Sequence, residues 1–196
     1  AFGYGMTHLK EGDEVLITLA EHASNTLPWF EVAKHTGAII KYIDLDEEGK
    51  VTLENVRKAV TEHTKIISLA QITNVLGYLA PIKEICNFAH EHDIIVCVDG
   101  AQSAPHHAVD VQDLDVDFFA FSGHKMCGPT GVGVSYGKYH LLEEMTPTRF
   151  GGGSNARYNS CGLVKLKNAP TKFESGTPNI EGVIGLGSAI EYLQKI

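Results

Sequence analysis

A short apolar segment that stops at a glycine constrains the fold of this chain more than any other feature. Residues 118–121 are all apolar, Ser122 and Gly123 follow them, and Lys125 comes two positions after the glycine. The segment Ile94–Val98 ends in the same way, on Asp99. Runs that are apolar at consecutive positions are typical of strands covered on both faces, as in a largely parallel sheet. The carboxyl ends of such strands lie at one edge, where α/β proteins bind their ligands.

Several such segments alternate with helical patterns along the chain. The expected strands are Val15–Leu19, Ala38–Ile43, Lys65–Ala70, Ile94–Val98, Phe118–Phe121 and Gly133–Tyr136. Apolar residues recur at helical spacing in Leu53–Val60 and again after Pro81, a residue suited to the first turn of a helix. This alternation predicts a three-layer α/β/α domain with a mostly parallel sheet and right-handed crossovers. The region Thr146–Pro178 breaks the pattern and predicts a long irregular loop.

Composition narrows the classes of function. The chain has 196 residues, of which 43% are hydrophobic, and can therefore bury a full core. It carries 16 basic and 24 acidic residues without a basic cluster, which argues against nucleic acid and favours a small-molecule partner. Its apolar runs are far shorter than the roughly 20 residues of a membrane span. The four cysteines lack paired C-x-x-C spacing, so we expect a cytoplasmic protein without disulfides.

Residue spacing also argues against two other kinds of site. The pairs His90 with His92 and His106 with His107 lack the i, i+4 placement and the supporting cysteines of a zinc site, so we expect no metal. The glycine triplet 151–153 is not followed by a Lys-Ser or Lys-Thr step, which excludes a nucleotide phosphate loop.

The lysine and the acid at neighbouring strand ends predict a site for pyridoxal 5'-phosphate. Lys125 offers an amine that can hold the cofactor aldehyde as a Schiff base, and Asp99 offers a carboxylate that can keep the ring nitrogen protonated. A partly desolvated lysine on a turn after a buried strand loses its proton more easily. Taken alone, Lys125 could be a solvated surface residue and Asp99 a turn former, so the prediction depends on the pair.

A histidine follows a third expected strand. His22 comes just after Val15–Leu19 and before a helical stretch that begins around Pro28. Its planar ring can stack on a pyridine ring, and imidazole titrates in the range suited to proton transfer, although a surface histidine is an equal alternative. Other polar residues at equivalent strand ends offer hydrogen-bonding groups for a cofactor: Asn74, Gln102, Ser122 and His124.

Five motifs occur in a fixed order over nearly the whole chain. They are Glu21-His22-x-x-Asn25-x-x-Pro28-Trp29, Thr73-Asn74-Val75-Leu76-Gly77, Val98-Asp99-Gly100-Ala101-Gln102, Ser122-Gly123-His124-Lys125-x-x-Gly128-Pro129-Thr130-Gly131 and Phe173-Glu174-Ser175-Gly176-Thr177-Pro178-Asn179. Together they resemble the group II cysteine desulfurases, which are aminotransferase class V enzymes. The resemblance implies the large domain of the fold-type I pyridoxal-phosphate-dependent transferases.

Carried over position by position, the resemblance implies four roles around the cofactor ring. Lys125 is the lysine that binds the cofactor covalently, and Asp99 is the partner of the pyridine nitrogen. Gln102 hydrogen-bonds the ring hydroxyl oxygen. His22 stacks over the ring and shuttles protons.

The resemblance also implies contacts around the phosphate and the substrate. Ser122 and His124 hold the cofactor phosphate, and Asn74 lies near the ring and the substrate carboxylate. Gly176 and Thr177 reach the phosphate bound in the other subunit. The implied assembly is therefore a homodimer with shared sites.

Three elements of the family pattern are not found between Ala1 and Ile196. They are an upstream glycine-threonine loop for phosphate, a downstream arginine for the substrate carboxylate and a downstream cysteine that receives sulfur. We therefore expect residues 1–196 to be a partial cofactor-binding large domain without its N-terminal segment and its C-terminal small domain. Cys127 and Cys161 are interpreted as ordinary cysteines and not as the sulfur acceptor.

The implied activity is conversion of L-cysteine to L-alanine with a protein-bound persulfide that supplies sulfur for iron-sulfur cluster assembly, with a sulfur-acceptor protein as a possible partner. One alternative is a selenocysteine lyase, and another class V aminotransferase-type enzyme is more distant. An alternative of a different kind is a catalytically incomplete fragment or scaffold. The yellow absorbance of a lysine-bound cofactor separates an enzyme from a scaffold, and we expect these 196 residues alone to bind the cofactor weakly.

Overall fold

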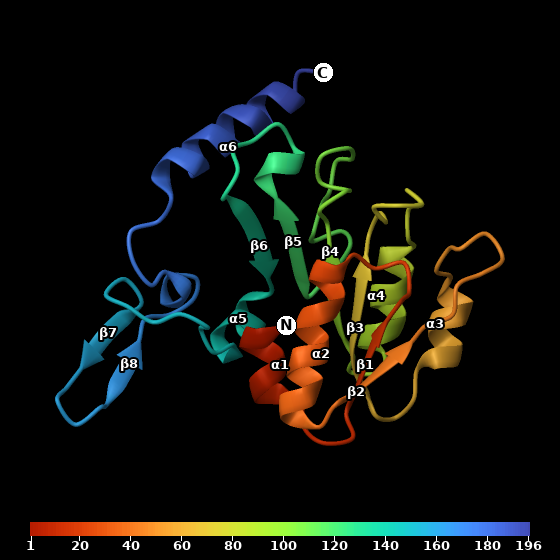
Figure 1. Ribbon diagram of the computed structural model, residues 1–196, viewed down its shortest axis with the longest axis horizontal. Coiled ribbons are helices and arrows are strands. Elements are labelled where there is room, and N and C mark those ends of the chain that lie inside the picture. The colour runs from red at the N-terminus through yellow and green to blue at the C-terminus, as the bar shows by residue number, and fades with distance from the viewer.

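The computed structural model describes residues 1–196 and contains a central sheet of six strands in the order β2-β1-β3-β4-β5-β6 (Figure 1). The strands are Glu14–Ile17 (β1), Ile39–Tyr42 (β2), Thr64–Ala70 (β3), Ile95–Asp99 (β4), Phe118–Ser122 (β5) and Gly133–Gly137 (β6). Strands β1 to β5 run parallel, and β6 is antiparallel to β5. The expected mostly parallel α/β architecture is confirmed, with strand ends displaced by two residues at most.

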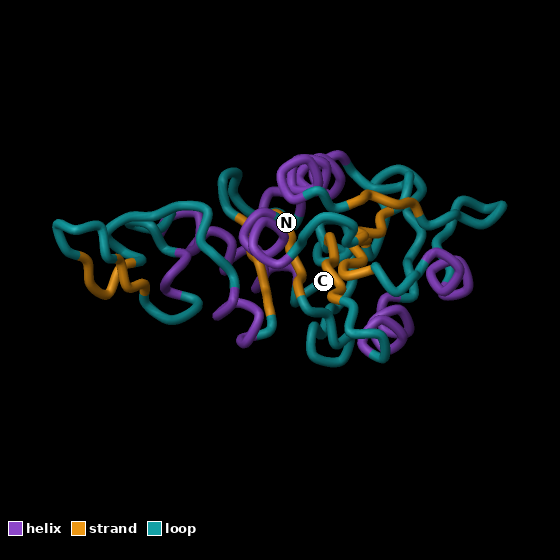
Figure 2. The backbone as a smooth tube through the Cα atoms, turned by 90° about the horizontal axis from the view of Figure 1, so that it is seen from below, coloured by secondary structure: helices purple, strands orange, loops and turns teal.

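Helices cover both faces of this sheet (Figure 2). They are Phe2–His8 (α1), Ala23–Thr36 (α2), Leu53–Ala59 (α3), Ile82–His90 (α4), Tyr139–Glu144 (α5) and Ile180–Leu193 (α6). On one face, Trp29 and Val32 of α2 pack on Val15 and Ile17 of β1. On the other face, α3 and α4 pack on the strand side chains that point away from α2. None of the helices combines the length and the apolar character needed to cross a bilayer.

Sequence reasoning missed α1 because two glycines give its segment a low helix propensity. The structure shows what these glycines allow. A methyl group on Gly5 would lie 2.9 Å from a methyl carbon of Val32 and 3.1 Å from the ring of Trp29. Glycine therefore lets α1 approach α2 closely, and tertiary packing compensates for the weak propensity.

Helix α2 begins five residues earlier than the sequence predicted, at Ala23 instead of Pro28. His22 is its N-cap residue, and the His22 Nδ1 atom accepts a hydrogen bond from the Ser24 backbone N–H at 3.1 Å. Histidine is not among the preferred N-cap residues, so the start of the helix left no strong signal. Gly37 ends the helix with φ of 78°, a left-handed conformation that glycine adopts without strain.

The region Thr146–Pro178 is not the irregular loop that its composition predicted. It contains a two-stranded antiparallel hairpin of Asn155–Tyr158 (β7) and Val164–Leu166 (β8), which extends away from the central sheet (Figure 1). The hairpin escaped detection because its strands are only four and three residues long and carry exposed charged side chains such as Arg157 and Lys165. Such strands lack the apolar alternation on which the prediction depended.

A buried carboxylate stabilises the amino-terminal ends of β4 and β5, which lie at the opposite end of the sheet from Asp99 and Lys125. Asp117, just before β5, is 3% exposed. It accepts a hydrogen bond from the Val96 N–H at 2.7 Å, pairs with His90 Nε2 at 2.9 Å and forms an ion pair with Lys138 at 3.0 Å. The carboxylate therefore joins α4, β4 and the start of α5 at one point.

We expect Asp117→Ala to lower the free energy of unfolding by about 3 kcal/mol, because it leaves the buried Val96 N–H without its acceptor and removes one of the two carboxylates that pair with Lys138. Urea denaturation of the full-length protein measures the loss. The control is Asp113→Ala, which breaks only an exposed pair with Lys83 and should cost less than about 1 kcal/mol. Equal losses for the two variants would contradict the structural role of Asp117.

Candidate active site

A cavity of about 640 Å³ lies where the carboxyl ends of β4 and β5 meet the beginning of α2. Five of the residues singled out in the sequence line it together: His22, Asp99, Ser122, His124 and Lys125. They come from three separate stretches of the chain that the parallel sheet brings to one edge. These five side chains bring two imidazoles, a carboxylate, an amine and a hydroxyl group to the cavity.

Lys125 ends a short 3-10 turn, Gly123–Lys125, directly after β5. The turn is held closed because the backbone N–H groups of Met126 and Gly128 both donate to the Gly123 carbonyl, at 3.0 and 2.9 Å. A methyl group on Gly123 would lie 2.9 Å from Val132 and 3.3 Å from Leu186 of α6, so only glycine fits this packing. The Lys125 side chain is half-buried, lines the cavity and forms no ion pair, which leaves its amine available.

Asp99 is the last residue of β4, and its two carboxylate oxygens differ. Oδ1 accepts a hydrogen bond from the Ala101 N–H at 2.8 Å, as a turn former would, while Oδ2 has no partner in the protein. A methyl group on Gly100 would lie 2.0 Å from the Phe119 ring, so the strand can end here against β5 only with glycine. The turn role and a ligand role of Asp99 are therefore compatible.

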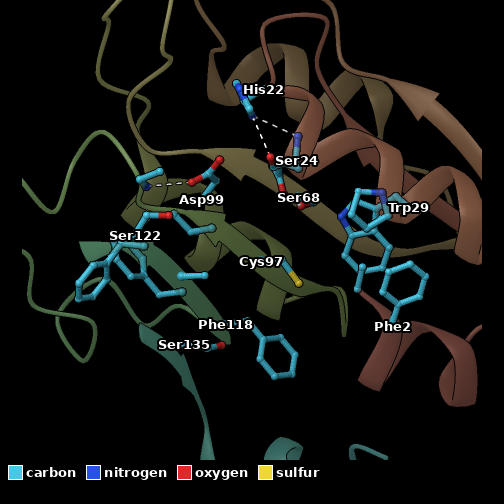
Figure 3. A pocket seen from close by; sticks show the side chains of 18 of the residues that line it. Phe2, His22, Ser24, Trp29, Ser68, Cys97, Asp99, Phe118, Ser122 and Ser135 are labelled. Carbon is cyan, nitrogen blue, oxygen red and sulfur yellow. Dashed lines mark hydrogen bonds between the residues drawn. The ribbon is translucent and has the colours of Figure 1, made fainter. Parts of the chain in front are cut away.

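His22 combines its capping role with a free ring nitrogen. Because Nδ1 accepts the Ser24 N–H, the neutral ring carries its proton on Nε2, which has no partner in the protein. In the view of the cavity, His22, Asp99 and Ser122 lie around one end (Figure 3). The imidazole is exposed and thus accessible to a ligand in this end of the cavity.

A chain of hydrogen bonds beside His22 was not predicted. The Asn25 side chain donates to Glu21 at 2.8 Å and accepts from Ser68 at 2.8 Å, while Glu21 also accepts from Thr18 at 2.9 Å. Burial raises the pKa of Glu21, and the nearby charge of Asp99 raises it further. The only feature of the sequence that indicated this network is the i, i+4 spacing of Glu21 and Asn25 at the beginning of α2. The network fixes Asn25 and Ser68 in the wall of the cavity.

Four predicted site residues do not line this cavity. Gln102 is half-buried in the turns that follow Asp99. Asn74 is exposed and lines a second, smaller hollow of about 450 Å³, which shares His22 with the main cavity. Gly176 and Thr177 are exposed in the segment before α6 and belong to neither cavity. Their assigned roles remain predictions.

The other end of the cavity is mainly apolar, and sequence reasoning did not find it. Phe2, Trp29 and Phe118 lie there, with Cys97 between them and the polar end (Figure 3). Burial raises the pKa of the Cys97 thiol to about 12. At neutral pH this thiol is protonated and therefore a poor nucleophile.

We expect iodoacetamide at pH 8 to modify Cys127 and Cys161 in the folded protein and to spare Cys97 and Cys86. The first two side chains are exposed, whereas burial raises the pKa of Cys97 and of Cys86 to about 12. Alkylation rates follow the thiolate fraction. Peptide mass spectrometry measures the modification, and guanidinium should make all four cysteines reactive. Equal rates for Cys97 and Cys161 in the folded protein would contradict this expectation.

No group of three or more histidine, cysteine, aspartate or glutamate side chains is arranged to hold a metal ion. The mostly parallel α/β sheet, with a free lysine and a free carboxylate oxygen at adjacent strand ends, has the arrangement expected of the fold-type I class. The match to the family described as aminotransferase class-V covers residues 1–196. The chain belongs to the aminotransferase class V family.

The resemblance to cysteine desulfurases is confirmed by comparison with known proteins. A probable cysteine desulfurase of Halalkalibacterium halodurans is 52% identical over 100% of this chain and 48% of its own length. The crystal structure of the cysteine desulfurase CsdA from Escherichia coli matches with a TM-score of 0.95 and 42% identity, over 98% of this chain and 48% of that one.

A more distant structure is the C-DES mutant K223A with glycine covalently linked to the PLP-cofactor. It has a TM-score of 0.85 and 26% identity, over 99% of this chain and 54% of that one. The chain thus spans about half the length of the relatives it matches.

Proposed function

We propose that the full-length protein is a pyridoxal-phosphate-dependent cysteine desulfurase. It converts L-cysteine and a cysteine thiol of the enzyme into L-alanine and a cysteine persulfide, so that sulfur moves from one carbon–sulfur bond into a new sulfur–sulfur bond. The observation that carries the proposal is the convergence of Lys125 and Asp99 in one cavity of a chain 52% identical to a probable cysteine desulfurase. In this proposal, residues 1–196 are the cofactor-binding part of the large domain.

The residues in the cavity fit pyridoxal 5'-phosphate by their chemistry. Lys125 has an unpaired amine for the aldehyde, and Asp99 has an unpaired carboxylate oxygen for the ring nitrogen. His22 contributes a planar ring with a free Nε2, and Ser122 and His124 contribute polar groups for the phosphate. When bound, this cofactor supplies an electron sink for the bonds at the substrate α-carbon.

Each side chain has a defined task in this assignment. Lys125 would hold the cofactor and then, once free, act as the base and acid that moves a proton to and from the substrate α-carbon. Asp99 would remain a carboxylate and keep the ring nitrogen protonated through Oδ2, while Oδ1 keeps its bond to Ala101. His22 would cover the ring and donate or accept a proton at Nε2.

Four further residues complete the assignment although they lie outside the main cavity. Gln102, three positions after Asp99 in the chain, would hydrogen-bond the ring oxygen. Asn74, which lines the smaller hollow together with His22, would approach the ring and the substrate carboxylate. Thr177, together with Gly176, would reach the phosphate in the second subunit of a homodimer. Their exposure in the isolated chain is compatible with a contact to another subunit.

The persulfide cysteine and the carboxylate-binding arginine lie outside residues 1–196 in this proposal. Cys97 is unsuited to the role of sulfur acceptor because burial raises its pKa to about 12. The product persulfide would pass to a sulfur-acceptor protein in the cytoplasm and supply iron-sulfur cluster assembly.

The test is turnover by the full-length protein supplied with pyridoxal 5'-phosphate. We expect a yellow protein that borohydride bleaches and that releases alanine and, with a thiol reductant, sulfide in equal amounts from L-cysteine. Release of selenide from L-selenocysteine without turnover of L-cysteine would overturn the proposal in favour of a selenocysteine lyase. A colourless protein without turnover would favour the non-catalytic scaffold.

A further inference from the structure

The glycine triplet 151–153 packs its backbone directly against the segment that carries Gly176 and Thr177. A methyl group on Gly151 would lie 2.0 Å from the carbonyl oxygen of Ser175, and one on Gly153 would lie 2.3 Å from the carbonyl oxygen of Glu174. Both distances are far below any real contact, and the obstacle is backbone that cannot rotate away. At these two positions the packing admits glycine alone.

Side chains on the hairpin side hold the triplet in place. Ser154 is 1% exposed, and its hydroxyl accepts from the Gly151 N–H at 3.2 Å and donates to the Gly151 carbonyl at 3.0 Å. The Asn155 side chain donates to the Gly152 carbonyl at 3.0 Å, and Lys167 donates to the Gly153 carbonyl at 2.8 Å. The triplet is therefore a fixed surface against which the neighbouring segment can be placed.

The segment 175–177 is anchored on both sides but keeps its own donors free. On its C-terminal side, Asn179 caps α6 by accepting from the Gly182 N–H at 3.0 Å and donates to the Gly131 carbonyl at 3.3 Å. The backbone N–H groups of 175–177 and the Thr177 hydroxyl have no partner in the chain. Free N–H groups on a held loop are suited to bind an anionic oxygen.

We propose that Gly151 and Gly153 are positioning residues for the cofactor phosphate. By admitting the backbone of 174–176 at close range, they set where Gly176 and Thr177 present their N–H and hydroxyl donors. The inference rests on the proposed function, in which these donors bind the phosphate of the cofactor held by the other subunit.

The test uses the full-length protein and measures the Kd for pyridoxal 5'-phosphate by fluorescence titration of the apo form. Gly151→Ala and Gly153→Ala should each raise the Kd by about tenfold or more, the scale of one lost hydrogen bond to a charged group. The matched control is Gly152→Ala, because nothing lies within 4 Å of that position and its φ is not positive. The control should shift the Kd by less than about twofold.

A gentler variant covers the case in which the alanine variants do not fold. Lys167→Met removes the hydrogen bond to the Gly153 carbonyl without adding a clash, and it should raise the Kd by about threefold. A Kd that is unchanged in Lys167→Met and in every folded alanine variant would overturn the proposal.

Thr177→Val separates this inference from the proposed function, because it removes a donor and leaves the triplet intact. If Thr177→Val raises the Kd and the glycine variants match the Gly152 control, the positioning role fails while the phosphate contact stands. If Thr177→Val leaves the Kd unchanged while the glycine variants raise it, the backbone N–H groups make the contact without the hydroxyl, and the positioning role stands. If Thr177→Val and the glycine variants all leave the Kd unchanged, the phosphate contact and the positioning role both fail.

Mixed dimers test whether the segment 175–177 of one subunit contacts the cofactor site of the other subunit. One subunit carries Gly151→Ala, and the other carries Lys125→Ala with a normal glycine triplet. The only lysine that can bind the cofactor covalently then faces a normal segment from the other subunit, so we expect yellow absorbance from one site per dimer at the wild-type Kd. A Kd that remains raised would show that the segment acts within its own subunit and would overturn the assignment to the partner site.

Discussion

Replacing Lys125 by alanine is expected to abolish the yellow absorbance of the full-length protein and to lower turnover of L-cysteine by about a thousandfold or more, the scale of loss for a group that transfers protons. Lys125 carries the only side-chain amine among the residues that line the main cavity, and it has no ion-pair partner. No neighbouring side chain can replace it. Absorbance spectra and single-turnover alanine release measure the two effects.

Two control variants sharpen this expectation. Lys125→Arg keeps the positive charge but cannot lose a proton, so it should be as colourless and inactive as the alanine variant. Lys58→Ala, on the exposed face of α3 and paired only with Glu54, should leave absorbance and turnover unchanged. A yellow, borohydride-sensitive Lys125→Ala protein would remove Lys125 from its assigned role.

The second large effect is expected for Asp99→Asn, which should reduce turnover by about a hundredfold and keep the yellow absorbance. Asparagine preserves the shape and the bond to the Ala101 N–H but removes the charge that keeps the ring nitrogen protonated. A hydrogen bond to a charged group contributes about 1.5–3 kcal/mol, and each 1.36 kcal/mol is tenfold in rate. Steady-state kcat, with the cofactor absorbance recorded in parallel, measures the change.

Asp99→Ala should reduce turnover at least as much as the asparagine variant, because it also removes the acceptor for the Ala101 N–H. Asp113→Asn, at an exposed pair with Lys83, is the control for a general loss of negative charge. Turnover that survives in Asp99→Asn would show that the carboxylate does not act on the ring nitrogen.

The fold could be predicted well where the signal was local. Consecutive apolar residues such as 94–98 and 118–121 indicate strands buried on both faces, and these strands are present as β4 and β5. The prediction failed where packing overrides local preference. Helix α1 contains Gly3 and Gly5, and Gly5 packs against Trp29 and Val32, which lie more than twenty positions away in the chain.

For the site, the positions of the strand ends predicted a set of candidate residues. They did not predict which of these candidates line the same cavity. Residue 99 ends β4, and residue 125 lies just after β5. These two strands are parallel neighbours, so their carboxyl ends lie side by side and both residues line the cavity. Gln102 is only three positions beyond Asp99, yet the turns that follow place it outside. Cys97 lies in the cavity wall although nothing in its sequence context indicated so.

The positions of the strands along the chain and the candidate lysine and carboxylate at their ends could be predicted from the sequence by itself, because they depend on hydrophobic runs and on where those runs end. The hydrogen-bond chain through Asn25, the apolar end of the cavity and the contact of Gly151 with Ser175 were decided by the tertiary structure alone. These features join segments far apart in the chain. Their existence depends on side-chain direction and on approaches of a few ångströms, which residue patterns do not encode.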